Sequence, residues 1–171
     1  DIFKLDYQIK KGTDENPKSK MAAEYLKYLG TRDISASKKQ EEFYKIGAEM
    51  NVSCNAEEIK ISLTGLNENF EESVALMEDI LANAVADEDA FSNLKMDMLK
   101  KREDAKKNKQ TILFGAMRAY ARYGVNSSFS NVLSDEEIEN TTAVELIEII
   151  HNFTKDEHII LYYGPSSTTE L

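Results

Sequence analysis

Two histidines and one cysteine are the residues whose types best suit metal binding or nucleophilic catalysis in this sequence. His151 and His158 are too far apart for ligands on adjacent turns of one helix, and they have no cysteine partner. His151 falls at the end of a predicted helix, where a cation favours the helix dipole. A nucleophilic Cys54 would need a base beside it, whereas its place between Val52 and Ala56 predicts a small strand side chain. We therefore predict structural roles for all three.

Two further patterns concern phosphates and nucleic acids. The seven glycines lie too far apart to form a phosphate-binding loop. Basic residues cluster over 100–109, but Glu103 and Asp104 interrupt them, and no aromatic residue between Phe91 and Phe114 is available to stack on a base. We predict a solvated helix face here. Nucleic-acid binding through 100–109 is an alternative, and steeply salt-dependent affinity would indicate it.

Composition narrows the class of protein. The chain has 171 residues, the size of one domain, and its 21 basic and 31 acidic residues give a net charge of −10. This negative charge argues against a protein dedicated to binding nucleic acid or an anionic membrane surface. A 42% hydrophobic content with only 2 prolines predicts a folded chain. The longest apolar run, 159–163, is far shorter than the ~20 residues of a membrane-spanning helix.

The single cysteine also bears on the compartment. One thiol excludes an internal disulfide and any multi-thiolate zinc or iron–sulfur site. A reducing compartment fits this composition, and so does a periplasmic protein that needs no disulfide.

Periodicity locates the strands and their order. Apolar residues alternate over 2–9 and recur over 159–163, which predicts two strands. The stretch 52–65 alternates as well and indicates either a strand pair or one long strand.

Helical spacing separates these strands. It covers 21–29, with Gly30 as the expected C-terminal cap, and then 70–81, 87–98 and 112–123. Three capping boxes are expected to start helices, and they pair Ser37 with Gln40, Ser134 with Glu137, and Thr142 with Glu145. Because strands adjacent in sequence favour antiparallel pairing, we predict an α+β fold with an antiparallel sheet and helices packed mainly on one face.

The segment 21–31, Met-Ala-Ala-Glu-Tyr-Leu-Lys-Tyr-Leu-Gly-Thr, resembles the inverted zincin peptidases, the family of pitrilysin, insulinase and the mitochondrial processing peptidases. The first helix of that family carries His-x-x-Glu-His, followed by an aromatic residue and Gly-Thr. The likeness continues at Gly-Ala-Glu-Met-Asn over 47–51 and at Tyr-Tyr-Gly-Pro over 162–165, so it covers nearly the whole chain. The resemblance implies a processing-peptidase-like domain.

The zinc motif of the family is degenerate in this sequence. Aligned residue by residue, Met21 replaces the first histidine, Glu24 is the catalytic glutamate and Tyr25 replaces the second histidine. The distal glutamate falls at Lys101, or at Lys100 if the register slips by one. A thioether and a phenol cannot replace two imidazoles, and an ammonium opposes a cation. We therefore expect this domain to be zinc-dead, with no catalytic, cofactor-binding or metal-binding residue.

The resemblance also implies a domain organisation. We expect residues 1–165 to form a single peptidase-homology domain and 166–171 to begin a linker or tail, with both ends cut from a longer chain. The sequence looks like the first domain of the second half of a bacterial member, and a bacterial source would favour a periplasmic or cell-envelope location over the cytoplasm. The substrate-contacting Arg and Tyr of the family are expected in the following domain, so neither Arg118 nor Tyr123 is assigned that role.

The function implied is that of a non-catalytic domain of a zinc metalloendopeptidase. It would form part of the wall of a clamshell chamber that encloses and holds peptide substrates, while another domain binds zinc and hydrolyses the peptide bond. The expected partners are other domains of the parent peptidase or a partner chain, and the peptide substrate. A structural or assembly subunit of the same fold, without peptidase activity, is the alternative. A His-x-x-Glu-His motif in the parent reading frame or in an adjacent gene distinguishes the two.

Overall fold

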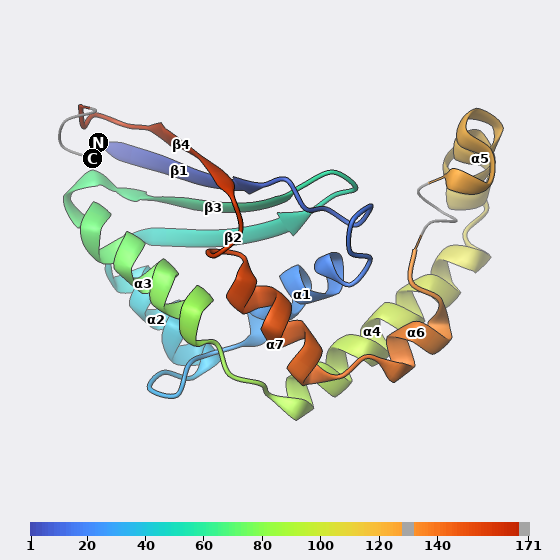
Figure 1. The fold of residues 1–171 in the computed structure, drawn as a ribbon, viewed down its shortest axis with the longest axis horizontal. Coiled ribbons are helices and arrows are strands. Elements are labelled where there is room, and N and C mark those ends of the chain that lie inside the picture. The colour runs from blue at the N-terminus through green and yellow to red at the C-terminus, as the bar shows by residue number, and fades with distance from the viewer. Residues whose placement is uncertain (128–131, 168–171) are drawn as a thin grey trace.

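The computed structural model describes residues 1–127 and 132–167. Its sheet contains the strands β1 (Ile2–Ile9), β2 (Ala48–Cys54), β3 (Ile59–Leu66) and β4 (His158–Tyr163) in the order β2-β3-β1-β4 (Figure 1). Every neighbouring pair is antiparallel. The predicted α+β class and the predicted antiparallel sheet are therefore confirmed.

Strand register gives the sheet one buried face. Leu5 of β1 lies opposite Leu63 of β3 and Tyr162 of β4, so these side chains share a face. Leu5 and Leu63 are buried, whereas Ile2 and Leu66 on the other face are exposed. This period of two is the pattern that the sequence displays over 2–9.

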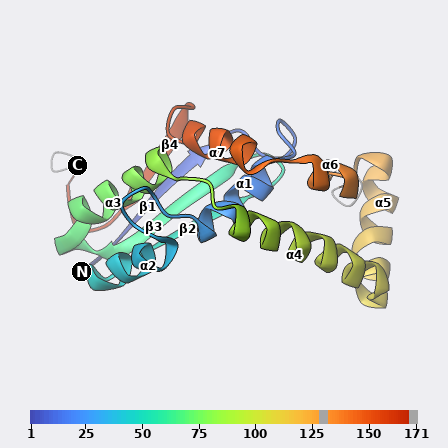
Figure 2. The same ribbon diagram turned by 90° about the horizontal axis from the view of Figure 1, so that it is seen from below.

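The helices lie on the buried side of the sheet, and α4 runs away from it along the length of the molecule (Figures 1 and 2). The α-helices are α1 (Ser19–Tyr25), α2 (Ala36–Lys45), α3 (Phe70–Asn83), α4 (Glu88–Lys107), α5 (Arg118–Tyr123), α6 (Asp135–Asn140) and α7 (Ala143–Asn152). The remaining helical segments are the 3-10 turns η1 (Leu26–Tyr28), η2 (Asn67–Asn69) and η4 (Gly124–Asn126), and the π-helical segment η3 (Thr111–Met117). None of the helices within the described ranges is both long and apolar enough to cross a bilayer.

The core forms between the sheet and α1, α3 and α7. The side chains with the largest fully buried volumes are Tyr25, Phe3, Phe153, Ile9, Met21, Leu26, Leu29, Ile61, Leu63, Met77, Ile80 and Leu81. Because α1 contributes two of them, Met21 and Tyr25, this helix is held at the centre of the molecule.

Two of the three predicted capping boxes are confirmed. Ser134 accepts a hydrogen bond from the Glu137 amide at the start of α6, and Thr142 accepts one from the Glu145 amide at the start of α7. In both boxes the glutamate side chain returns the bond to the N-cap amide.

The third predicted box, Ser37 with Gln40, is wrong. Helix α2 begins two residues earlier, and Ser35 is its N-cap, accepting from the Lys38 amide at 3.2 Å. The preceding loop sets this start, since the Thr31 amide donates to the Ile34 carbonyl at 2.8 Å and ends the loop at that residue.

The prediction for Gly30 also needs correction. Helix α1 tightens into η1 and ends at Leu29, which is extended, and Gly30 lacks the positive φ of a left-handed cap. A glycine is needed because a Cβ at position 30 would overlap the carbonyl group of Ile34. Position 30 therefore requires glycine because two backbone segments approach each other closely there.

The stretch 52–65 is a strand pair rather than one long strand. β2 and β3 are joined by a turn in which the Asn55 side chain accepts hydrogen bonds from the amides of Glu57 and Glu58, both at 2.8 Å. An Asx turn of this kind reverses the chain and brings the two alternating segments into register.

Candidate functional site at the crossing of α1 and α4

The three residues aligned with the zinc motif all lie on α1, beneath the sheet. Met21 and Tyr25 occupy adjacent turns on its buried face and are 0% exposed, while Glu24 is half-buried. Their spacing of four residues places both side chains on one side of the helix. The alignment predicts this shared face, and here that face packs into the hydrophobic core.

The hydroxyl of Tyr25 is fully engaged by the start of α4. It donates to the Asp87 carbonyl oxygen at 2.8 Å and accepts from the Asp87 amide at 2.9 Å. The Tyr25 ring packs edge-on against Phe91 with 5.5 Å between ring centroids. Burial raises the pKa of the Tyr25 phenol above its ordinary value, so the neutral form persists. Tyr25 thus joins α1 to α4 instead of presenting a free ligand atom.

The position aligned with the distal glutamate lies away from this crossing. The side chain of Lys101 is 71% exposed, and its ammonium group lies 3.7 Å from the carboxylate of Asp97 on the same helix. Lys100 is exposed too. The face of α4 that is buried carries Phe91 and Leu94.

These residues do not fit a zinc ion. The donors at the crossing are a buried thioether and a phenol that already makes two hydrogen bonds, and zinc prefers imidazole, thiolate and carboxylate ligands. Across residues 1–127 and 132–167, no group of three or more His, Cys, Asp or Glu side chains is placed to hold a metal ion. A glutamate at position 24 would need a metal-bound water in order to act as a general base, and the donors at this crossing are not ligands that zinc prefers.

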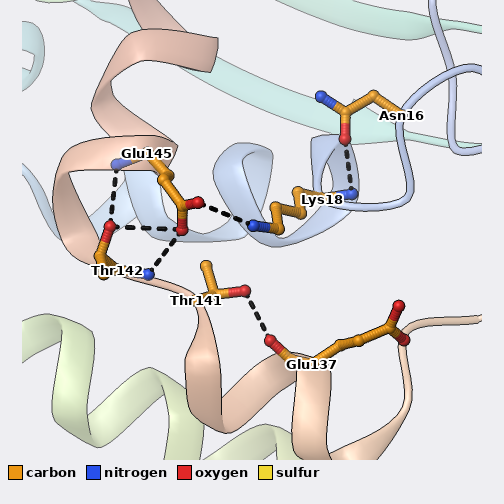
Figure 3. Close-up of polar contacts among 6 residues, drawn as sticks. All are labelled: Asn16, Lys18, Glu137, Thr141, Thr142 and Glu145. Carbon is orange, nitrogen blue, oxygen red and sulfur yellow. Dashed lines mark hydrogen bonds and ion pairs between the residues drawn. The ribbon is translucent and has the colours of Figure 1, made fainter.

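An ion pair links Lys18, the N-cap residue of α1, to α7. The ammonium group of Lys18 lies 3.1 Å from the carboxylate of Glu145, and Asn16 accepts from the Lys18 amide at 3.0 Å (Figure 3). The same Glu145 carboxylate accepts from the Thr142 amide at 2.9 Å. One carboxylate thus caps α7 and positions the helix that carries the degenerate motif.

A groove of about 320 Å³ lies between η1, α2 and the edge strand β2. Its residues are Leu26, Lys27, Lys39, Gln40, Phe43, Glu49, Met50, Asn51, Val52 and Ile80. The Asn51 position belongs to the Gly-Ala-Glu-Met-Asn segment that carries the family resemblance. Met50 and Asn51 both lie in β2.

Lys39 lines this groove, and no sequence pattern identifies it. Its side chain is 7% exposed, and the ammonium group donates to the carbonyl oxygens of Leu26 at 3.0 Å and Lys27 at 3.2 Å. Burial lowers the pKa of Lys39 to about 8. Its partners are main-chain carbonyls of η1. The Leu26 carbonyl also accepts from the Leu29 amide at 3.3 Å, so the amine adds a further hydrogen bond at the end of this helix.

The remaining sequence candidates lie apart from one another. A ring nitrogen of His151 lies 2.9 Å from the Ala84 carbonyl, and His158 stacks on Tyr7 with 5.0 Å between ring centroids. Cys54 is half-buried near the end of β2, and burial raises the pKa of its thiol. The lysines of 100–109 are exposed, as predicted.

Comparison with known proteins agrees with this geometry. The sequence pattern described as insulinase, peptidase family M16, matches residues 13–136. The mitochondrial-processing peptidase subunit beta of Neurospora crassa is 24% identical over 161 residues, which cover 94% of this chain and 34% of that protein. The chain spans about a third of the length of the curated relatives it matches.

Solved structures share the fold. The periplasmic protease PqqL from Escherichia coli superposes with a TM-score of 0.78 at 11% identity, over 99% of this chain and 19% of that one. The peptidase M16 inactive domain from Pseudomonas fluorescens superposes with a TM-score of 0.72 at 16% identity, over 86% of this chain and 37% of that one. Because the family pattern covers more than half of the chain, this protein belongs to the insulinase family of peptidases, family M16.

Proposed function

We propose that this chain is a non-catalytic domain of a zinc metalloendopeptidase, one that walls the substrate chamber while another domain binds zinc and cleaves the peptide. The proposal rests on the roles that the residues at the zinc-motif positions have in the structure. Met21 and Tyr25 fill the core, and the Tyr25 hydroxyl is bound to the backbone of α4. A helix that once presented zinc ligands would serve here to hold the fold together.

The domain limits and the partners follow from the same reasoning. Residues 1–165 would be the homology domain and 166–171 the start of a linker, of which 168–171 lie outside the described residues. The relatives are about three times as long as this chain, which supports further domains as partners. A peptide would be held between such domains, and zinc would belong to the catalytic one.

A location in the cell envelope fits one comparison. The protease PqqL, whose fold this chain shares, is periplasmic in Escherichia coli, whereas the processing-peptidase relatives are mitochondrial. We propose the periplasm for a bacterial source, and fractionation of cells that produce the whole polypeptide tests this directly.

The role of the degenerate motif is tested in the longest natural polypeptide that carries this domain. Where that polypeptide or its partner contains His-x-x-Glu-His, replacing the glutamate of that motif with Gln should abolish hydrolysis of a quenched fluorescent peptide. Glu24→Gln should leave kcat/KM within about twofold of wild type, because Glu24 has no metal-bound water to activate. Loss of activity in Glu24→Gln, with normal folding, would contradict the proposal. Absence of His-x-x-Glu-His from both chains would instead favour the assembly subunit.

A further inference from the structure

The segment formed by η3 and α5 exposes an apolar helical surface that packs against nothing else described. Its exposed large hydrophobic side chains are Ile112 at 40%, Leu113 at 52%, Phe114 at 67%, Met117 at 59%, Tyr120 at 58% and Tyr123 at 58%. We call these six residues the arm face. None of the residues within η3 and α5 is buried.

The arm face has the periodicity of an amphipathic helix. Leu113, Met117 and Tyr120 recur at intervals of four and three residues, which aligns them along one side. Isolated helices shorter than about 12–15 residues are marginal in water, so such helices are normally stabilised by packing of the apolar side. The sequence predicts a helix over 112–123, and in the structure its apolar side chains are exposed. The surface that completes it must come from outside the domain.

Charge sets the arm apart from the rest of the molecule. Within residues 111–123 the charged residues are Arg118 and Arg122 alone, and the remainder of the chain contains 19 basic and 31 acidic residues, a net charge of −12. Arg118 and Arg122 belong to α5 itself. A complementary partner surface therefore has an apolar centre and a rim of carboxylates.

The opposite end of the same molecule has that chemistry. A hollow of about 430 Å³ at the start of α3 is lined by Glu68, Glu71 and Glu72. Next to it, the end of the sheet exposes Ile2 at 64% and Leu66 at 39%, which are paired across β1 and β3. We call these five residues the acidic end. The arm and the acidic end lie at opposite ends of the long axis (Figures 1 and 2).

We propose that the arm face of one copy of this chain docks on the acidic end of a second copy, head to tail. The arm face and the acidic end of one copy lie too far apart to touch each other, so this contact requires a second copy. Such a contact is heterologous, because each copy contributes a different surface, and it can extend to further copies. One helix face buries less than a standard interface of roughly 800 Å² per partner, so we expect a dissociation constant on the order of micromolar.

Sedimentation velocity of the purified chain at rising concentration tests the proposal. The weight-average sedimentation coefficient should rise with concentration, and the rise should shrink at high salt because the rim is charged. Met117→Ser with Tyr120→Ser should weaken association at least about tenfold. The matched control is Tyr44→Ser with Val144→Ser, which alters two exposed apolar residues on α2 and α7 and should change nothing. Circular dichroism confirms that each variant keeps its helices.

Charge reversal distinguishes this arrangement from an arm-to-arm dimer. Arg118→Glu with Arg122→Glu should weaken self-association, and so should Glu71→Lys with Glu72→Lys. An equimolar mixture of the two variants should associate again, since each then meets an oppositely charged surface. Unchanged association of the Glu71→Lys, Glu72→Lys variant would overturn the head-to-tail contact.

Two other outcomes would also overturn the proposal. One is a wild-type chain that stays monomeric up to about a hundred times the expected dissociation constant. The other is a monomeric chain that co-sediments with phosphatidylglycerol vesicles and loses this binding in Met117→Ser with Tyr120→Ser, which would assign the arm face to a lipid surface.

Discussion

The hydroxyl of Tyr25 offers a direct test of how the degenerate motif is used. Tyr25→Phe removes one oxygen atom and keeps the buried ring, its edge contact with Phe91 and the volume of the core. What it deletes is the pair of hydrogen bonds to the Asp87 carbonyl and amide, 2.8 and 2.9 Å long. The change therefore isolates the polar link between α1 and α4.

The expected cost follows from these two bonds. A typical intramolecular hydrogen bond contributes about 0.5–1.5 kcal/mol net, so losing two costs ~1–3 kcal/mol. The Asp87 carbonyl still accepts from the Phe91 amide at 2.9 Å, which favours the lower half of that range. For a chain of this size each kcal/mol lowers Tm by roughly 2–4 °C.

Urea unfolding followed by circular dichroism measures the effect. The free energy of unfolding of Tyr25→Phe should fall by ~1–2 kcal/mol with an unchanged m-value. Tyr44→Phe is the matched control, because Tyr44 is 85% exposed, and it should stay within about 0.5 kcal/mol of wild type. If Tyr25→Phe matched this control, the hydroxyl would not join the helices as described.

Three further perturbations test other parts of the structure. The pKa of Lys39 is lowered to about 8 by burial, so the unfolded chain binds more protons than the folded one above that pH. Urea titrations should therefore show Lys39 adding stability as pH rises from about 8 to 10, by at most ~1.4 kcal/mol per pH unit, and Lys39→Met should lose this contribution while Lys101→Met keeps it. Glu145→Ala removes the glutamate half of the α7 capping box and the Lys18 ion pair and should cost ~1–2 kcal/mol, whereas Glu145→Gln keeps an acceptor for the Thr142 amide and should cost less than about 1. Equal costs for the two variants would show that the cap contributes nothing. Gly30→Ala should destabilise by ~1–3 kcal/mol through overlap with the Ile34 carbonyl, and a neutral result in thermal melts would refute that close approach.

Local sequence patterns predict most of the elements, because alternation and capping act over a few residues. The strands over 2–9 and 159–163 and the boxes at Ser134 and Thr142 are of this kind. The start of α2 could not be derived locally, since both Ser35 and Ser37 are suitable caps. The choice between them depends on the loop that ends at Ile34.

Contacts between distant residues account for what the sequence could not predict. The bond from Tyr25 to Asp87 spans 62 positions, and Lys39 is buried by main-chain carbonyls of another element. For the segment 112–123, the local pattern predicts the element but not its surroundings. Its periodicity correctly predicts a helix, but periodicity says only that one side is apolar and not which molecule covers it.

Metal content and peptide hydrolysis, measured together on the purified chain, test the central claim most directly. After dialysis against zinc-containing buffer and then metal-free buffer, inductively coupled plasma mass spectrometry should find well below one zinc per chain. No cleavage of quenched fluorescent peptides should be detected. A stoichiometric zinc ion that is lost in Glu24→Gln, together with chelator-sensitive cleavage by the wild-type chain, would contradict the account.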